Sequence, residues 1–144
     1  MRALVDTSAL YALLDEDDAN HAPARDWFTS EASVPSTILA THSYVIVESC
    51  ALVQRRLGPE AVSVLLDTFI PSFSVLYVDE DLHQRAAAAY MASFSKRGVS
   101  FVDRVSFEMI RKLALDVAFA FDVDFEAEGF QMVPAGGTTK TAQP

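Results

Sequence analysis

Carboxylates stand at several places in this chain where a charge needs an explanation. Asp6 ends the short apolar run "RALVD", and Asp122 ends "VAFAFD", with Asp124 two residues later. Glu48 has apolar neighbours one helical turn away on each side, and Asp103 lies in the first turn of a predicted helix. Because an unpaired charge on a buried face is costly, these acids have either local structural roles or a shared chemical one.

Each acid has an ordinary structural interpretation when it is taken alone. Asp6 would cap the helix that follows it, and Asp103 forms a Ser-x-x-acid capping box with Ser100. Glu48 could pair with an arginine from another element, and the two later aspartates suit a turn. Asp79 follows another predicted strand and begins a predicted helix, so we interpret it as a cap only.

As a set, the acids favour a metal site. Two carboxylates about 4 Å apart repel by ~4 kcal/mol at an effective dielectric constant near 20, so three or four together need protons, arginines or a divalent cation. Oxygen ligands without histidine or cysteine partners favour Mg²⁺ or Mn²⁺. The three histidines, His21, His42 and His83, lack ligand spacing, and we interpret them as surface or helix-packing residues.

The surrounding sequence predicts an α/β fold with a mostly parallel central sheet flanked by helices, because short apolar strands alternate with amphipathic helices. Ligands of such sheets bind at the carboxyl ends of the strands, where Asp6 and Asp122 fall. The predicted strands cover 2–6, 33–40, 73–78, 117–121 and 131–133. The predicted helices cover 8–14, 18–31, 41–58, 59–70, 79–98 and 100–115, and a loop with a helical turn covers 122–130.

Length and composition indicate one globular domain in a reducing compartment. The chain has 144 residues, is 51% hydrophobic and carries a formal net charge of -9. That charge argues against general binding of phosphate backbones, unless a metal reverses the charge in an acidic pocket. Cys50 is the only cysteine, which suits the cytoplasm and a place in the core. No apolar run reaches the ~18 residues of a membrane span, and no signal peptide is expected.

Four segments occur in an order that resembles the PIN-domain nucleases, in particular the VapC-type ribonuclease toxins of type II toxin–antitoxin pairs. They are "LVDTSALYALL", "VIVESCALVQRR", "FVDRVSFEMIRKL" and "AFAFDVDFEAEGF". The resemblance covers residues 1–133 as one PIN-like domain and leaves 134–144 as a tail that we expect to be disordered.

The resemblance implies a Mg²⁺ or Mn²⁺ site with Asp6, Glu48 and Asp103 as core ligands. Either Asp122 or Asp124 completes it, and Asp122 fits the strand end better. Hydroxyl groups of Thr7, Ser8 and Ser106 would lie against the ligands. Many members have a hydroxyl residue two positions before the fourth acid, where this chain has Ala120, and this departure predicts weaker metal binding.

The implied activity is metal-dependent endoribonuclease cleavage of RNA, with a metal-activated water in place of a nucleophilic side chain. The implied partners are a cognate antitoxin protein and a second copy of the chain, with no membrane. Two alternatives remain, a non-catalytic PIN-like binding or assembly module and a nuclease that acts on DNA.

Binding of the substrate and of the antitoxin needs side chains other than the acids. The candidates for RNA contact are Arg104, Arg55, Arg56, Lys96 and Arg97. For these cations we favour helix-end charge and pairs such as Arg104–Glu108. For the antitoxin we predict an apolar docking surface made of Trp27, Phe28 and the stripe Leu10–Leu14, with burial in the core as the alternative.

Overall fold

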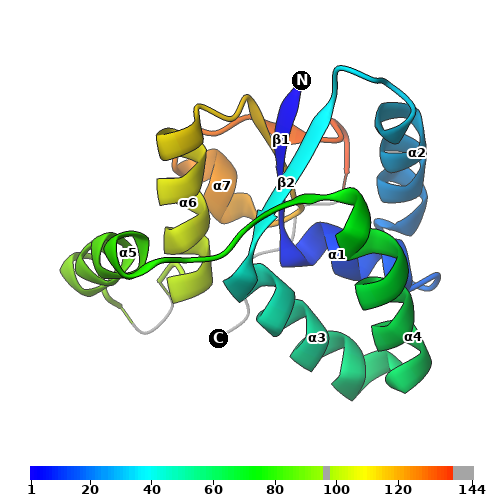
Figure 1. The fold of residues 1–144 in the computed structure, drawn as a ribbon, viewed down its shortest axis with the longest axis horizontal. Coiled ribbons are helices and arrows are strands. Elements are labelled where there is room, and N and C mark those ends of the chain that lie inside the picture. The colour runs from blue at the N-terminus through cyan, green and yellow to red at the C-terminus, as the bar shows by residue number, and fades with distance from the viewer. Residues whose placement is uncertain (96–97, 138–144) are drawn as a thin grey trace.

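A computed structural model describes residues 1–95 and 98–137 (Figure 1). The predicted tail therefore lies mostly outside the described residues. The strands are β1 (Arg2–Val5), β2 (Ile38–His42), β3 (Ser74–Leu76), β4 (Val117–Phe119) and β5 (Met132–Val133). The α-helices are α1 (Thr7–Leu14), α2 (His21–Ala32), α3 (Ser43–Leu57), α4 (Pro59–Val64), α5 (Glu80–Ala92), α6 (Phe101–Leu113) and α7 (Val123–Ala127). Among the described residues, no helix is both long and apolar enough to cross a membrane.

The five strands form one parallel sheet in the order β3-β2-β1-β4-β5, which confirms the predicted α/β class. β1 lies at the centre, where Leu4 is in register with Ala40 of β2 and Ala118 of β4. Because all strands run the same way, the ends of β1 and β4 meet at one edge of the sheet. This edge is the lower one in Figure 1, where β1 leads into α1.

Helices cover both faces of the sheet, so the central strand is apolar on both sides. Ala3 and Val5 are fully buried in the larger core, with residues of α1, α2 and α3. Leu4 points to the opposite face and packs with Phe107 and Ile110 of α6. Because successive side chains of β1 point to opposite faces and both faces are covered, the segment "ALV" is apolar at every position.

The apolar residues predicted as a docking surface for the antitoxin belong to the core. Leu10 and Leu13 are buried, and Trp27 and Phe28 of α2 pack against the same core cluster. The ring centroid of Trp27 lies 4.5 Å from that of Phe119 in β4. The alternative, burial in the core, therefore holds for Leu10 and Leu13, whereas Leu14, Trp27 and Phe28 are partly buried. Cys50 packs against the same core, as predicted.

Several element boundaries differ from the predicted ones. α5 ends at Ala92 and not at Gly98, because the Ser93 hydroxyl donates to the carbonyl of Ala89 at 2.8 Å and closes the helix early. α2 begins after Asn20 and not after Asp18, whose carboxylate instead accepts from the Asn20 N–H at 2.8 Å. The helix predicted over 59–70 continues beyond α4 as a π-helical turn, Leu65–Phe69, and a 3-10 turn, Ile70–Ser72.

Candidate metal centre

Asp6 is both a helix cap and a member of the acidic cluster. Its backbone N–H donates to the Phe119 carbonyl at 3.0 Å, which ties the end of β1 to β4. Its carboxylate accepts from the Ser8 N–H at 3.1 Å and from the Ser8 hydroxyl at 2.6 Å, and only 3% of the residue is exposed. The Ser8 hydroxyl also accepts from the Phe121 N–H at 2.9 Å. Ser8 therefore fixes the orientation of Asp6 and the spacing of two strand ends.

α6 brings Asp103 to the same edge of the sheet. The Asp103 N–H donates to the Ser100 hydroxyl at 3.1 Å, so Ser100 caps this helix. The Asp103 carboxyl group is buried and lies near those of Asp122, Asp6 and Glu48. The backbone N–H of Asp103 thus takes part in the predicted helix cap, whereas its side chain belongs to the acidic cluster.

The chain after β4 adds two further carboxylates. Asp122 caps α7 and accepts from the Asp124 N–H at 2.9 Å, as the turn interpretation predicts. Oxygens of Asp103, Asp122 and Asp124 all lie within 4.8 Å of one another, so both later aspartates reach Asp103. Oδ2 of Asp124 is buried and has no hydrogen-bond partner among the residues that the structure describes. An oxygen in this state is a free ligand position, so the residues present fit a hard divalent cation.

Glu48 approaches the cluster from α3. It is half-buried, and a hydrogen bond from the Thr7 hydroxyl favours its ionised form. Thr7 accepts in turn from the Ser49 hydroxyl at 3.2 Å. Within residues 1–95 and 98–137 no arginine pairs with Glu48, so the interpretation as an ion pair was wrong.

The electrostatics of the cluster show a surplus of negative charge. Burial, together with the neighbouring carboxylates of Asp6 and Asp122, raises the pKa of Asp103 to about 10. Burial also raises the pKa of Asp6 to about 7, although its hydrogen bonds from Ser8 oppose the shift. The pKa of Glu48 and that of Asp124 are raised by burial and by Asp122. A bound divalent cation would remove this cost.

In metal-free protein we expect the free energy of unfolding to fall as the pH rises from ~6.5 to ~9. With its folded pKa raised, Asp6 binds more protons in the folded than in the unfolded state, so stability is lost as the pH rises through about 7. Asp103 extends this loss to higher pH. The slope approaches ~1.4 kcal/mol per pH unit for each extra proton held by the folded state.

Thermal melts in EDTA across this range test that expectation, and saturating Mn²⁺ should abolish the decline. A metal-free melting temperature that rises over the same range would contradict it. The range begins at 6.5 because burial lowers the pKa of His42 to about 4 from the ordinary 6.5, which gives the opposite slope at lower pH.

His42 has a structural role that sequence reasoning did not identify. It is fully buried, its Nδ1 accepts from the Val45 N–H at 3.3 Å, and its Nε2 lies 2.9 Å from the Ser106 hydroxyl. His42 thus caps α3 and joins it to α6 as a neutral side chain. Ser106, predicted to lie against the metal ligands, is bound to His42. The signal was the position of His42 directly before the α3 pattern, where caps occur.

Arg104 does not form the predicted pair with Glu108. It donates to Glu128 at 3.1 Å and to the Ser93 hydroxyl at 2.7 Å, with 14% of its side chain exposed. Glu128 also accepts from Arg111 at 2.7 Å, and these arginines hold the pKa of Glu128 below its usual value. Because Glu128 directly follows α7, Arg104 links α6, which carries Asp103, to the segment that carries Asp122 and Asp124.

Replacement of Arg104 should destabilise the protein more than replacement of Arg111. Arg104→Met leaves a half-buried Glu128 with one cation fewer and should cost ~2 kcal/mol of unfolding free energy. Arg111→Met removes a half-exposed partner of the same carboxylate and should cost under ~1 kcal/mol. Urea denaturation of both variants measures the difference, and equal losses would refute the distinction.

The other predicted RNA-contacting cations lie elsewhere. Arg55 and Arg56 are exposed in the last turn of α3, and the guanidinium of Arg56 lies over the Tyr11 ring. Lys96 and Arg97 are outside the described residues. Nδ1 of His83 lies 2.6 Å from the Tyr44 hydroxyl, and Nδ1 of His21 lies 2.8 Å from the Ala12 carbonyl. The histidines thus serve packing and capping, and the acidic cluster found in the described chain contains none of them.

Comparisons with known proteins agree with this geometry. Residues 3–130 match the family model of the PIN domain. The 23S rRNA-specific endonuclease VapC20 of two strains of Mycobacterium tuberculosis is 35% identical over 130 residues, which are 88% of this chain and 93% of the relative.

Solved structures give the same result for the fold. The crystal structure of M. tuberculosis VapC20, described as a sarcin-ricin loop cleaving toxin, has a TM-score of 0.76 and 33% identity, and covers 89% of this chain and 95% of that one. The VapBC2 complex of Rickettsia felis, bound to a DNA fragment from its promoter, has a TM-score of 0.67 at 10% identity, over 92% and 97% of the two chains. The latter similarity supports the fold alone.

Proposed function

Because this chain belongs to the PIN-domain family, we propose that it is a metal-dependent endoribonuclease, the toxin of a toxin–antitoxin pair. The observation that carries the proposal is the convergence of Asp6, Asp103 and Asp122 at the carboxyl edge of the sheet, with Asp124 and Glu48 beside them. Their raised pKa values and the unpartnered Asp124 Oδ2 support a cation as the missing partner.

The side chains divide into ligands and groups that orient the ligands. Asp103, Asp122 and Asp124 would hold Mg²⁺ or Mn²⁺, and the carboxylates of Asp6 and Glu48 lie near enough to raise the pKa of Asp103. When bound, the cation polarises a phosphoryl oxygen and lowers the pKa of a water. The Ser8 hydroxyl and the Thr7 hydroxyl hold Asp6 and Glu48 through the hydrogen bonds already described.

The described hydroxyl groups of Thr7, Ser49 and Ser106 near the cluster are buried, which supports water as the nucleophile. The Ser8 hydroxyl donates to Asp6 and accepts from the backbone of Phe121. The Ser106 hydroxyl bonds His42, and Thr7 bonds Ser49 and Glu48. Hydrolysis by a water leaves the acids to hold the cation and to accept the proton that the water loses.

We propose that the substrate is 23S ribosomal RNA. Because that RNA is in the cytoplasm, we propose that the protein acts there. The support is the 35% identity to the M. tuberculosis enzyme, whose name states that specificity. We also propose that the protein binds a protein antitoxin and a second copy of itself. The 33% identity to M. tuberculosis VapC20, whose structure is described as that of a toxin, supports the antitoxin, and self-association follows from the family resemblance alone.

Cleavage of purified ribosomes tests the function and its alternatives. Protein with Mn²⁺ should produce a discrete break in 23S rRNA, mapped by primer extension, and excess EDTA should abolish it. A single-stranded DNA of equal length should neither be cut nor compete well. Cleavage of DNA alone would establish the deoxyribonuclease alternative, and intact nucleic acids under all conditions would favour the non-catalytic module.

A further inference from the structure

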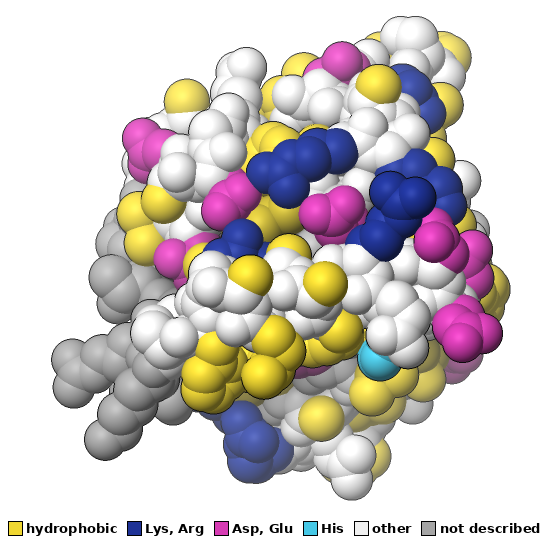
Figure 2. Space-filling view, turned by 90° about the vertical axis from the view of Figure 1, so that its left-hand side faces the viewer, with side chains coloured by type: hydrophobic (Ala, Val, Ile, Leu, Met, Phe, Trp, Pro, Cys, Tyr) yellow, Lys and Arg dark blue, Asp and Glu magenta, His cyan; other side chains and the backbone are white. Residues whose placement is uncertain are grey.

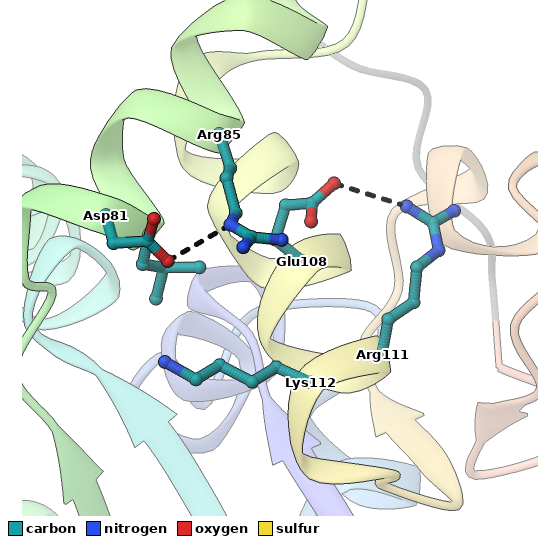
Figure 3. Close-up of a pocket in the computed structure, with 6 residues that line it drawn as sticks. Asp81, Arg85, Glu108, Arg111 and Lys112 are labelled. Carbon is teal, nitrogen blue, oxygen red and sulfur yellow. Dashed lines mark hydrogen bonds and ion pairs between the residues drawn. The ribbon is translucent and has the colours of Figure 1, made fainter.

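A hollow between α5 and α6 brings together three of the eight lysines and arginines that the structure describes. It has a volume of about 310 Å³ and is lined by Asp81, Leu82, Arg85, Glu108, Arg111 and Lys112 (Figure 3). Figure 2 shows basic side chains gathered on the upper part of this face, with acidic side chains between them. In a chain with a net charge of -9, such a cluster is exceptional.

Two of the three cations of this hollow, Arg85 and Lys112, are available to a ligand, whereas Arg111 pairs with Glu108 and Glu128. Lys112 is exposed and forms no ion pair with any residue that the structure describes. Arg85 pairs with Asp81 at 3.0 Å, but both side chains are about two-thirds exposed, 68% and 66%. Exposed pairs of this kind contribute little free energy and exchange readily for another anion. Figure 3 shows the Arg85 and Lys112 side chains over the same space between the two helices.

The hollow suits a charged chain better than a small molecule. Its volume lies at the lower limit for pockets that enclose small ligands, and those pockets are mainly apolar. Here five of the six described lining residues carry a charge, and their aliphatic stems supply apolar surface between the charged groups. Open, cationic surfaces with such dimensions are typical of contacts to a nucleic-acid backbone, where Lys and Arg neutralise phosphates.

The hollow also lies along a path from the acidic cluster. α6 carries Asp103 near its start and Arg111 and Lys112 near its end. At 1.5 Å rise per residue, eight residues separate the two places by ~12 Å along the helix. A few nucleotides cover that distance. In Figure 1 α6 begins at its lower end, near the carboxyl ends of the strands, and finishes at its upper end.

We propose that the α5–α6 hollow, through Arg85, Lys112 and Arg111, binds the phosphate backbone of RNA that extends from the cleavage site. This inference rests on the proposed ribonuclease function and assigns it a second contact with the substrate. The hollow supplies affinity for long RNA, whereas the acidic cluster performs the cleavage. Contacts to phosphates carry no base specificity, so the site strengthens binding of every long RNA.

The test compares the double variant Arg85→Gln, Lys112→Gln with a control that loses the same charge elsewhere. Arg2→Gln, Arg25→Gln is that control, because both arginines are exposed and neither lines the hollow. Arg111 stays unchanged, since it also holds Glu128. Binding of a labelled single-stranded RNA of about 20 nucleotides is measured in an Asp103→Asn background over a series of salt concentrations.

The α5–α6 double variant should bind this RNA at least about tenfold more weakly at 0.1 M salt, and its salt slope should be smaller by ~1.4. The control should stay within about twofold of the parent. In an otherwise unmodified chain, the double variant should cleave an RNA of about four nucleotides at the normal rate and a long RNA at a lower kcat/KM.

Equal RNA affinity and salt slope in the double variant and the control would overturn the proposal. The proposal would also be overturned if the double variant lost binding to polyglutamate but not to RNA, because the α5–α6 hollow would then bind an acidic protein. The measurement of RNA binding tests this inference without any measurement of cleavage. Absence of cleavage by the unmodified chain on both RNAs would instead contradict the ribonuclease function.

Discussion

Asp6→Asn, Glu48→Gln and Asp103→Asn should each lower cleavage of ribosomal RNA by ~100-fold or more. Each substitution keeps the shape of the side chain and removes one negative charge from the cluster. The loss of a ligand, or of its charge, weakens both cation binding and stabilisation of the reacting phosphate, and ~3 kcal/mol of this effect corresponds to a factor of ~100 in rate. Initial rates at saturating Mn²⁺ measure the change.

Asp79→Asn is the matched control for these substitutions. Asp79 also follows a strand and caps a helix, since its carboxylate accepts from the Leu82 N–H at 2.9 Å, as the sequence predicted. Asparagine is as good a cap as aspartate, so this variant should keep full activity. If Asp103→Asn and Asp79→Asn cleave RNA equally well, the acidic cluster has no catalytic role.

Asp6→Asn should make the metal-free protein more stable at pH 8, by ~1 kcal/mol or more. Burial makes the charged form of Asp6 unfavourable, and Asp122 and Glu48 repel it. Asparagine removes both costs and keeps an oxygen for the two hydrogen bonds from Ser8. For a domain of this size, 1 kcal/mol raises the melting temperature by ~2–4 °C.

In millimolar Mn²⁺ we expect the wild type to have the higher melting temperature, which is the reverse of the order without metal. Binding to the folded state stabilises the wild type by RT ln(1 + [L]/Kd), and the variant should gain much less. A cap without a cluster behaves differently, because Asp6→Asn would then change neither melting temperature by a measurable amount. Asp79→Asn again provides this reference, since its carboxylate serves a single helix N-terminus.

Much of the site was predictable because parallel sheets bring strand ends together. Asp6 and Asp122 are far apart in the sequence, but their strands are neighbours, so one rule about sheets placed them at one edge. Glu48 was identified by the conflict between its charge and the apolar spacing around it. The choice between Asp122 and Asp124 was not predictable, because it depends on how α7 turns after the strand, and both reach Asp103.

The remaining errors concern contacts between elements distant in the sequence. Glu108 lies one helical turn from Arg104, whereas the observed partner Glu128 is 24 residues away and depends on the packing of α7. Trp27 and Phe28 belong to the core because of the face of the sheet they cover, which helical periodicity alone does not specify. His42 caps α3 and contacts Ser106 across 64 residues, and no local pattern contains that pair.

Anomalous diffraction at the manganese edge, from crystals grown in millimolar Mn²⁺, tests the metal centre most directly. We expect a peak at the carboxyl edge of the sheet, with oxygens of Asp103 and Asp122 at a coordination distance of about 2.1–2.2 Å, and with Asp6, Asp124 or Glu48 bound directly or through water. An empty cluster with fully occupied Mn²⁺ at another acidic group, such as Glu80 and Asp81 at the start of α5, would contradict the proposed metal centre.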